Sequence, residues 1–183
     1  MAIQHTVPAT NLHEKSVQQK LNAMGLHTSI ITPTVGDVVA GDVLFVPTEI
    51  KNAVASPGGY AILSSILMTD KSGGDFGYDL YFFSSNVGPA ANGGTDEWSQ
   101  VLNNPFENNN EDTLFHLDNF LAVAGLAGGV AYGNDSRVFQ LTGLTIPVKA
   151  APGSTSIWVG CEARDNSAQS DGDMKFRFTF LQD

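Results

Sequence analysis

Two acidic turns hold the side chains whose types and spacing are best suited to chemistry. Residues 165–173, Asp-Asn-Ser-Ala-Gln-Ser-Asp-Gly-Asp, carry three carboxylates, and residues 70–75 carry two more. Oxygen ligands at this density could bind Ca²⁺, but neither turn has the Asp-x-Asp-x-Asp-Gly order or the closing Glu of a calcium loop. We therefore predict that both turns are solvated hairpin tips that bind no metal.

The histidines give no metal-binding pattern either. His116 stands two residues from Asp118, whereas His5, His13 and His27 are scattered. A metal site needs three or four converging ligands, and the chain has no His-x-His, His-Glu-x-x-His or Cys-x-x-Cys motif. The sequence predicts neither a metal site nor a cofactor site.

Catalysis by a nucleophile or by paired acids has no distinct signature. Cys161 is the single cysteine, so no internal disulfide can form, and the strand-like run around it predicts a small buried side chain. The 19 acidic residues offer many carboxylate pairs for sugar hydrolysis, but none stands out in an apolar setting. We predict no catalytic residue and no enzyme.

Aromatic side chains could instead bind a carbohydrate. Trp98, Tyr132 and Trp158 are the candidates. Trp158 lies between Ile157 and Val159 and is predicted to belong to the core. Trp98, in a polar stretch, is the better candidate, although a Trp there can also serve as an anchor for the loop.

Composition narrows the class of protein. The 183 residues suit one domain, and the charged fraction of 15% is below the roughly 25% of ordinary soluble domains, as the surface of an assembly subunit can be. The net charge of −10 and the scattered nine Lys and Arg argue against a nucleic-acid partner. No signal peptide and no apolar stretch of about 18 residues is present, so we expect synthesis in the cytoplasm and no membrane partner.

The first part of the chain is predicted to be an arm, residues 1–27, that contains a short helix at 12–24. Asn11 and Glu14 form a capping pattern, and Gly25 follows as a terminating glycine. The helix could pack on its own domain or on a neighbouring subunit. Its apolar residues at near-helical spacing are Leu12, Val17, Leu21 and Met24.

Residues 28–183 are predicted to form a single all-β domain. Short apolar runs recur about every ten residues between Gly, Pro and Asn, which is typical of an antiparallel β-sandwich or jelly roll. Residues 117–125 fit either a helical turn or a strand. The other runs are 29–32, 43–46, 60–69, 76–85, 137–142, 144–148, 156–163 and 175–181.

The stretch at 60–85 is predicted to organise this domain. Its two apolar runs flank the turn at 70–75 and are expected to pair as a hairpin of two central strands. The last run alternates clearly, with Lys175 and Arg177 on one face and Phe176 and Phe178 on the other. A long polar insertion at 87–113 interrupts the strands. Its apolar anchors, Trp98 and Phe106 among them, could reach a neighbour.

Several segments resemble one group of tailed-phage structural proteins. They cover about residues 50–86 and 117–183: Gly58-Gly59 before Ala61-Ile62-Leu63, Leu67-x-x-Asp70, Asp79-Leu80-x-Phe82, Asn86, the segment 118–131, Pro147-Val148-Lys149-Ala150, Ile157-Trp158-Val159 and Phe178-x-Phe180-Leu181-x-Asp183.

The resemblance implies a small β-sandwich virion protein, a capsid decoration (cement) protein on the capsid surface. Its implied partners are the major capsid protein and its own copies, as a homotrimer. The alternative is a receptor- or carbohydrate-binding module of a phage tail or fibre. The residues predicted to make inter-subunit contacts are Leu12, Val17, Leu21, Met24, Trp98 and Phe106.

Overall fold

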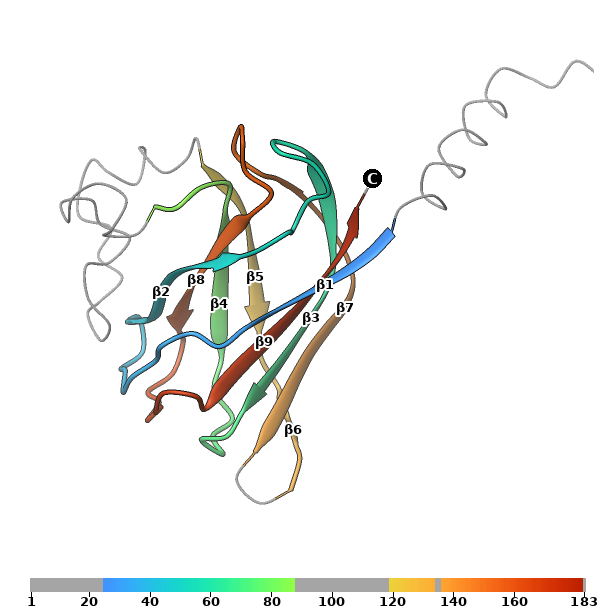
Figure 1. Ribbon diagram of the computed structural model, residues 1–183. Coiled ribbons are helices and arrows are strands. Elements are labelled where there is room, and N and C mark those ends of the chain that lie inside the picture. The colour runs from blue at the N-terminus through green and yellow to red at the C-terminus, as the bar shows by residue number, and fades with distance from the viewer. Residues whose placement is uncertain (1–24, 88–118, 134–135, 183) are drawn as a thin grey trace, which may run out of the picture.

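Two antiparallel β-sheets face each other in two layers (Figure 1). The computed structural model describes residues 25–87, 119–133 and 136–182. The five-stranded sheet has the order β1 (Gly25–Ile31), β9 (Met174–Gln182), β3 (Tyr60–Asp70), β7 (Arg137–Lys149), β6 (Val130–Ala131). The four-stranded sheet has the order β2 (Val43–Ile50), β8 (Ile157–Ala163), β4 (Tyr78–Phe83), β5 (Phe120–Leu126). The predicted all-β fold of antiparallel sheets is confirmed, and the predicted helix at 12–24 lies outside the described residues.

The strand order is that of a rolled-up hairpin. Strand β4 pairs with β5, β3 with β7, β2 with β8, and β1 with β9, so each strand of the first half pairs with its counterpart in the second half. Rolling this long hairpin distributes alternate pairs to opposite sheets and gives the jelly-roll arrangement. The predicted insertion falls at the tip of the rolled hairpin, between β4 and β5, and its residues from 88 onward lie outside the described ranges.

The prediction that 60–69 and 76–85 pair as a hairpin is wrong. The two strands, β3 and β4, belong to different sheets, and the 71–77 connection crosses from one layer to the other. Both strands are central, as predicted, because β3 lies between β9 and β7 and β4 lies between β8 and β5. Short turn-rich connections look alike in sequence whether they join paired strands or opposed layers, so local pattern did not distinguish the two.

A single bent strand replaces the two runs predicted at 137–142 and 144–148. Strand β7 continues through Gly143, whose φ of 70° lies in the left-handed region. The register with β3 shifts there, between the pairs Leu63–Ile146 and Ser65–Thr142. The glycine therefore marks a bulge inside a strand and not the turn between two strands. Of residues 117–125, which fit either a helical turn or a strand, residues 120–125 belong to strand β5.

The core between the layers is strongly aromatic. As predicted, Phe176, Phe178 and Phe180 of β9 are fully buried. Phe45 of β2 meets Phe176 edge-on with ring centroids 5.4 Å apart, and Phe82 of β4 meets Phe178 at 5.8 Å. These contacts join the two sheets and fix their separation through ring packing. Within the described ranges, no helix is long and apolar enough to cross a membrane.

Candidate functional site

The six residues predicted to contact other subunits lie outside the described ranges: Leu12, Val17, Leu21, Met24, Trp98 and Phe106. The polar and exposed groups of the sandwich itself therefore define the candidate sites. They fall into three regions: one end of the sandwich, the outer face of the four-stranded sheet, and the outer face of the five-stranded sheet.

A buried polar cluster closes one end of the sandwich. The Asp70 carboxylate is fully buried and accepts hydrogen bonds from the Tyr78 hydroxyl at 2.7 Å and from both the amide and the hydroxyl of Ser72 at 2.7 Å. Nε2 of Gln169 adds contacts to Asp70, Ser72 and Tyr78 at 3.0–3.2 Å. Four donors around one carboxylate satisfy its lone pairs, so the cluster joins the β3–β4 and β8–β9 connections rather than forming an open reactive site.

Neither acidic turn is a hairpin tip as predicted, because each joins strands of opposite sheets, although Asp165, Asp171 and most of 164–173 are exposed. Residues 164–173 connect β8 to β9 across the two layers, and within them Ser167 and Gln169 are buried. Asp171 accepts a hydrogen bond from the backbone amide of Val35 at 3.1 Å, and Asp165 accepts one from Gly77 at 2.8 Å. The carboxylates thus bind backbone amides, and no group of three potential ligands among the described residues could hold a metal ion.

The second acidic turn is held to the β5–β6 region by one arginine. Arg137 donates to the carbonyl of Gly129 at 2.8 Å and to that of Gly73 at 3.3 Å, and it pairs with Asp75 at 3.4 Å. Asp75 also accepts a hydrogen bond from the amide of Gly129 at 3.2 Å. These contacts give the turn a structural role.

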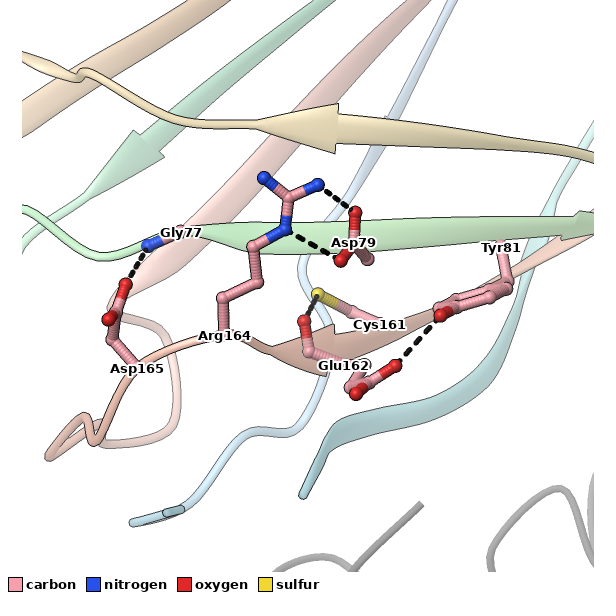
Figure 2. A network of polar contacts seen from close by, with 7 residues as sticks. All are labelled: Gly77, Asp79, Tyr81, Cys161, Glu162, Arg164 and Asp165. Carbon is pink, nitrogen blue, oxygen red and sulfur yellow. Dashed lines mark hydrogen bonds and ion pairs between the residues drawn. The ribbon is translucent and has the colours of Figure 1, made fainter. Parts of the chain in front are cut away.

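The outer face of the four-stranded sheet carries the polar network of Figure 2. Arg164 donates through Nε and Nη2 to the two carboxylate oxygens of Asp79, and the Tyr81 hydroxyl donates to Glu162 at 2.8 Å. Asp79 and Glu162 are direct cross-strand neighbours. The nearby Asp79 carboxylate raises the pKa of Arg164, and burial, reinforced by Glu162, raises the pKa of Tyr81.

Cys161 lies just beneath this network and is fully buried, as predicted. Burial raises the pKa of its thiol well above the ordinary value, and the carboxylates of Asp79 and Glu162 add to the effect. A thiol without thiolate character is a poor nucleophile. This arrangement matches the sequence prediction of a small buried side chain.

Trp158 is not part of the inter-sheet core, which corrects the prediction from its apolar neighbours. It is half-buried on the outer face, where it packs with Val43, Phe83 and Val87. Alternation along β8 from the charged Glu162 would have placed Trp158 on the outer face, whereas its apolar neighbours Ile157 and Val159 pointed to the core. Tyr132, the third carbohydrate candidate, is 75% exposed beside β6.

The outer face of the five-stranded sheet combines cations with exposed apolar side chains. Register places Leu26, Leu181, Ile62 and Pro147 in one row across β1, β9, β3 and β7. A parallel row holds Ile30, Arg177, Leu67 and Gln140. Leu26 is 71% exposed and Ile30 68%.

Three cations stand on the same surface. Lys175 and Arg177 alternate with the buried phenylalanines of β9, and Lys149 of β7 lies 5.0 Å from the centroid of the exposed Tyr60 ring. The strand residues on this side include no Asp or Glu. We call this surface the basic face. It is defined by Lys149, Lys175 and Arg177 with the row Leu26, Leu181, Ile62 and Pro147.

Sequence reasoning found only part of the basic face. Alternation in 175–181 put Lys175 and Arg177 on one side, but the apolar row joins four strands that are distant in sequence and needs their register.

No protein-family model matches the chain, and no curated protein sequence matches it. Among solved structures, the chain is similar to the one described as "The Structure of Tomato Aspermy Virus by X-Ray Crystallography". The TM-score is 0.39 with 8% sequence identity, and the match covers 94% of this chain and 93% of that chain. A likeness at this level carries no argument about function.

Proposed function

We propose that this chain is a structural virion protein that decorates a phage head. In this role it binds major capsid subunits and further copies of itself, and the added interfaces raise the free energy needed to separate the capsid subunits. The jelly roll does not by itself specify this role, since the same fold serves lectins and enzymes as well as capsids.

The basic face is the observation that carries the proposal. Large apolar patches are uncommon on the surface of proteins that stay monomeric, and they mark interaction sites. In this row Leu26 and Pro147 are exposed, and Leu181 and Ile62 are half-buried. Here the row from Leu26 to Pro147 crosses four strands of a sheet whose opposite side is already filled by the core. A surface of this kind suits permanent contact with another protein.

The predicted arm and insertion would supply further contacts in this proposal. Strand β1 begins at Gly25, so the arm can be removed up to residue 24 without cutting the sheet. The insertion leaves the sandwich at a defined neck, where the amide of Ser84 donates to the carbonyl of Asn119 at 2.7 Å and the Ser85 hydroxyl donates to the Asn119 side chain at 2.8 Å. Both segments can therefore be altered with the fold intact.

Binding to shells tests the proposal directly. Purified protein is mixed with empty heads of the phage that encodes it, and bound copies are counted by cryo-electron microscopy. We expect saturable binding by the full chain and greatly reduced occupancy for a chain that lacks residues 1–24. Absence of binding by the full chain would refute the decoration role, and full occupancy by the truncated chain would remove the arm from it.

Glycan binding is the second candidate function, and the outward orientation of Trp158 favours it. Tyr132 offers a second accessible ring, although it belongs to the other sheet. A glycan array is the discriminating measurement. A reproducible hit that Tyr132→Ala or Trp158→Phe abolishes would support a receptor-binding module over a decoration protein.

A further inference from the structure

We propose that the basic face receives the acidic segment 88–118 of a second copy of this chain. The inference rests on the proposed self-assembly and names the two surfaces that meet. It makes the contact heterologous, since one surface of a copy binds a different surface of its neighbour.

The charge of the basic face indicates which kind of surface binds it. Lys149, Lys175 and Arg177 are exposed, and among the described residues no acidic side chain forms an ion pair with any of them. Two copies that met through the same face would bring these cations together, which costs free energy. The face therefore calls for an acidic partner that also offers apolar side chains to the row at Leu26 and Ile62.

Segment 88–118 has this composition. It contains six Asp or Glu and no Lys or Arg, and it carries the apolar residues Trp98, Val101, Leu102 and Phe106. Its acids are Asp96, Glu97, Glu107, Glu111, Asp112 and Asp118. The arm is a poorer match, because residues 1–24 hold one Glu against two Lys and would add positive charge to a positive surface.

The place of the segment in the fold also fits a neighbour. The residues that flank it, Val87 and Asn119, belong to the neck between β4 and β5, in the four-stranded sheet. The basic face is the outer side of the other sheet, so the core lies between this face and the neck from which the segment departs. Copies that join in this way form a closed ring or an open chain, and a trimer is one such ring.

A charge swap tests the contact. Lys175→Glu with Arg177→Glu reverses the face, and Glu107→Lys with Glu111→Lys reverses the segment. Self-association is measured by sedimentation velocity over a range of concentrations. Each pair of changes should raise the dissociation constant about tenfold, because each exposed charge pair lowers it a few-fold. The combined variant should recover wild-type association to within about threefold, and added salt should weaken the wild-type contact. Lys51→Glu, which changes an exposed lysine directly after β2 of the other sheet, is the matched control and should associate as wild type.

Three results would overturn the inference: a wild-type chain that stays monomeric, a combined variant no better than its parents, or a control as weak as the reversed face. Arg177-dependent binding of a DNA duplex without self-association would assign the face to a polyanion instead. Shell binding is scored separately on the same variants. If the combined variant recovers self-association but the protein does not bind shells, only the decoration role is refuted. If the protein binds shells but does not self-associate, only this contact is refuted.

Discussion

Nε2 of Gln169 donates a hydrogen bond to Oδ2 of Asp70 at 3.2 Å, although the two residues are 99 positions apart. Asp70 ends β3 in the five-stranded sheet, and Gln169 lies in the connection that leaves the four-stranded sheet. The contact therefore joins the two layers at one end of the sandwich. Both side chains are buried, which makes the bond sensitive to the loss of either partner.

Asp70→Ala should be among the most destabilising polar substitutions in the described part of the chain. It leaves the Tyr78 hydroxyl, the Ser72 amide and Nε2 of Gln169 without their shared acceptor. We expect the free energy of unfolding to fall by about 2–4 kcal/mol, measured by urea denaturation. Asp171→Ala removes one hydrogen bond from an exposed residue and should cost about 1 kcal/mol or less. Equal losses for the two variants would contradict the role assigned to the buried cluster.

Alkaline pH should destabilise the fold through Cys161 and Tyr78. Burial raises the pKa of both groups, and the Asp70 carboxylate raises that of Tyr78 further. The unfolded chain ionises first, near pH 8.5 for the thiol and about 10 for the phenol, and so holds fewer protons than the folded chain. The free energy of unfolding is therefore highest below about pH 8.5. It falls as the pH rises, by up to about 1.4 kcal/mol per pH unit for each group.

Denaturation at a series of pH values checks this dependence. Cys161→Ala should flatten the fall between about pH 8.5 and 10, and Tyr78→Phe should reduce the steepening above 10. A wild-type stability that is constant from pH 8 to 11 would be inconsistent with the burial of these groups.

The rings of Phe82 and Phe178 should be energetically coupled. They meet edge-on at 5.8 Å with an interplanar angle of 90°, and they come from opposite sheets. Each Phe→Leu change should cost about 1–2 kcal/mol, and a double-mutant cycle should give a coupling of about 0.5–1.5 kcal/mol. Phe82→Leu combined with Ile30→Ala, on the exposed outer face, should be additive. Coupling of the same size in that control pair would indicate a global effect and not the ring contact.

Gly143→Ala should strain the bulge of β7. A Cβ at this position would meet no heavy atom within 4 Å, so the cost comes from the positive φ alone. We expect a loss of about 1–2 kcal/mol in the free energy of unfolding. Gly36→Ala is the control, because that glycine is equally open but lacks a left-handed φ. It should be neutral or slightly stabilising, since alanine restricts the unfolded chain.

The sequence by itself determined the secondary structure class and which face of the last strand is buried. Runs of branched and aromatic residues between Gly and Pro specify short strands, and the period of two in 175–181 identifies which phenylalanines are buried, because side chains alternate strictly along a strand. The strand-like run around Cys161 likewise sufficed to predict its burial.

Tertiary structure alone decided which strands pair and what the outer faces carry. The turn at 70–75 looked like a hairpin, yet pairing in a rolled hairpin depends on register between distant segments, which local sequence does not encode. For the same reason the joining of Lys149 with Lys175 and Arg177 could not be foreseen. It depends on side chains that become neighbours only when strands from both halves of the chain are laid side by side.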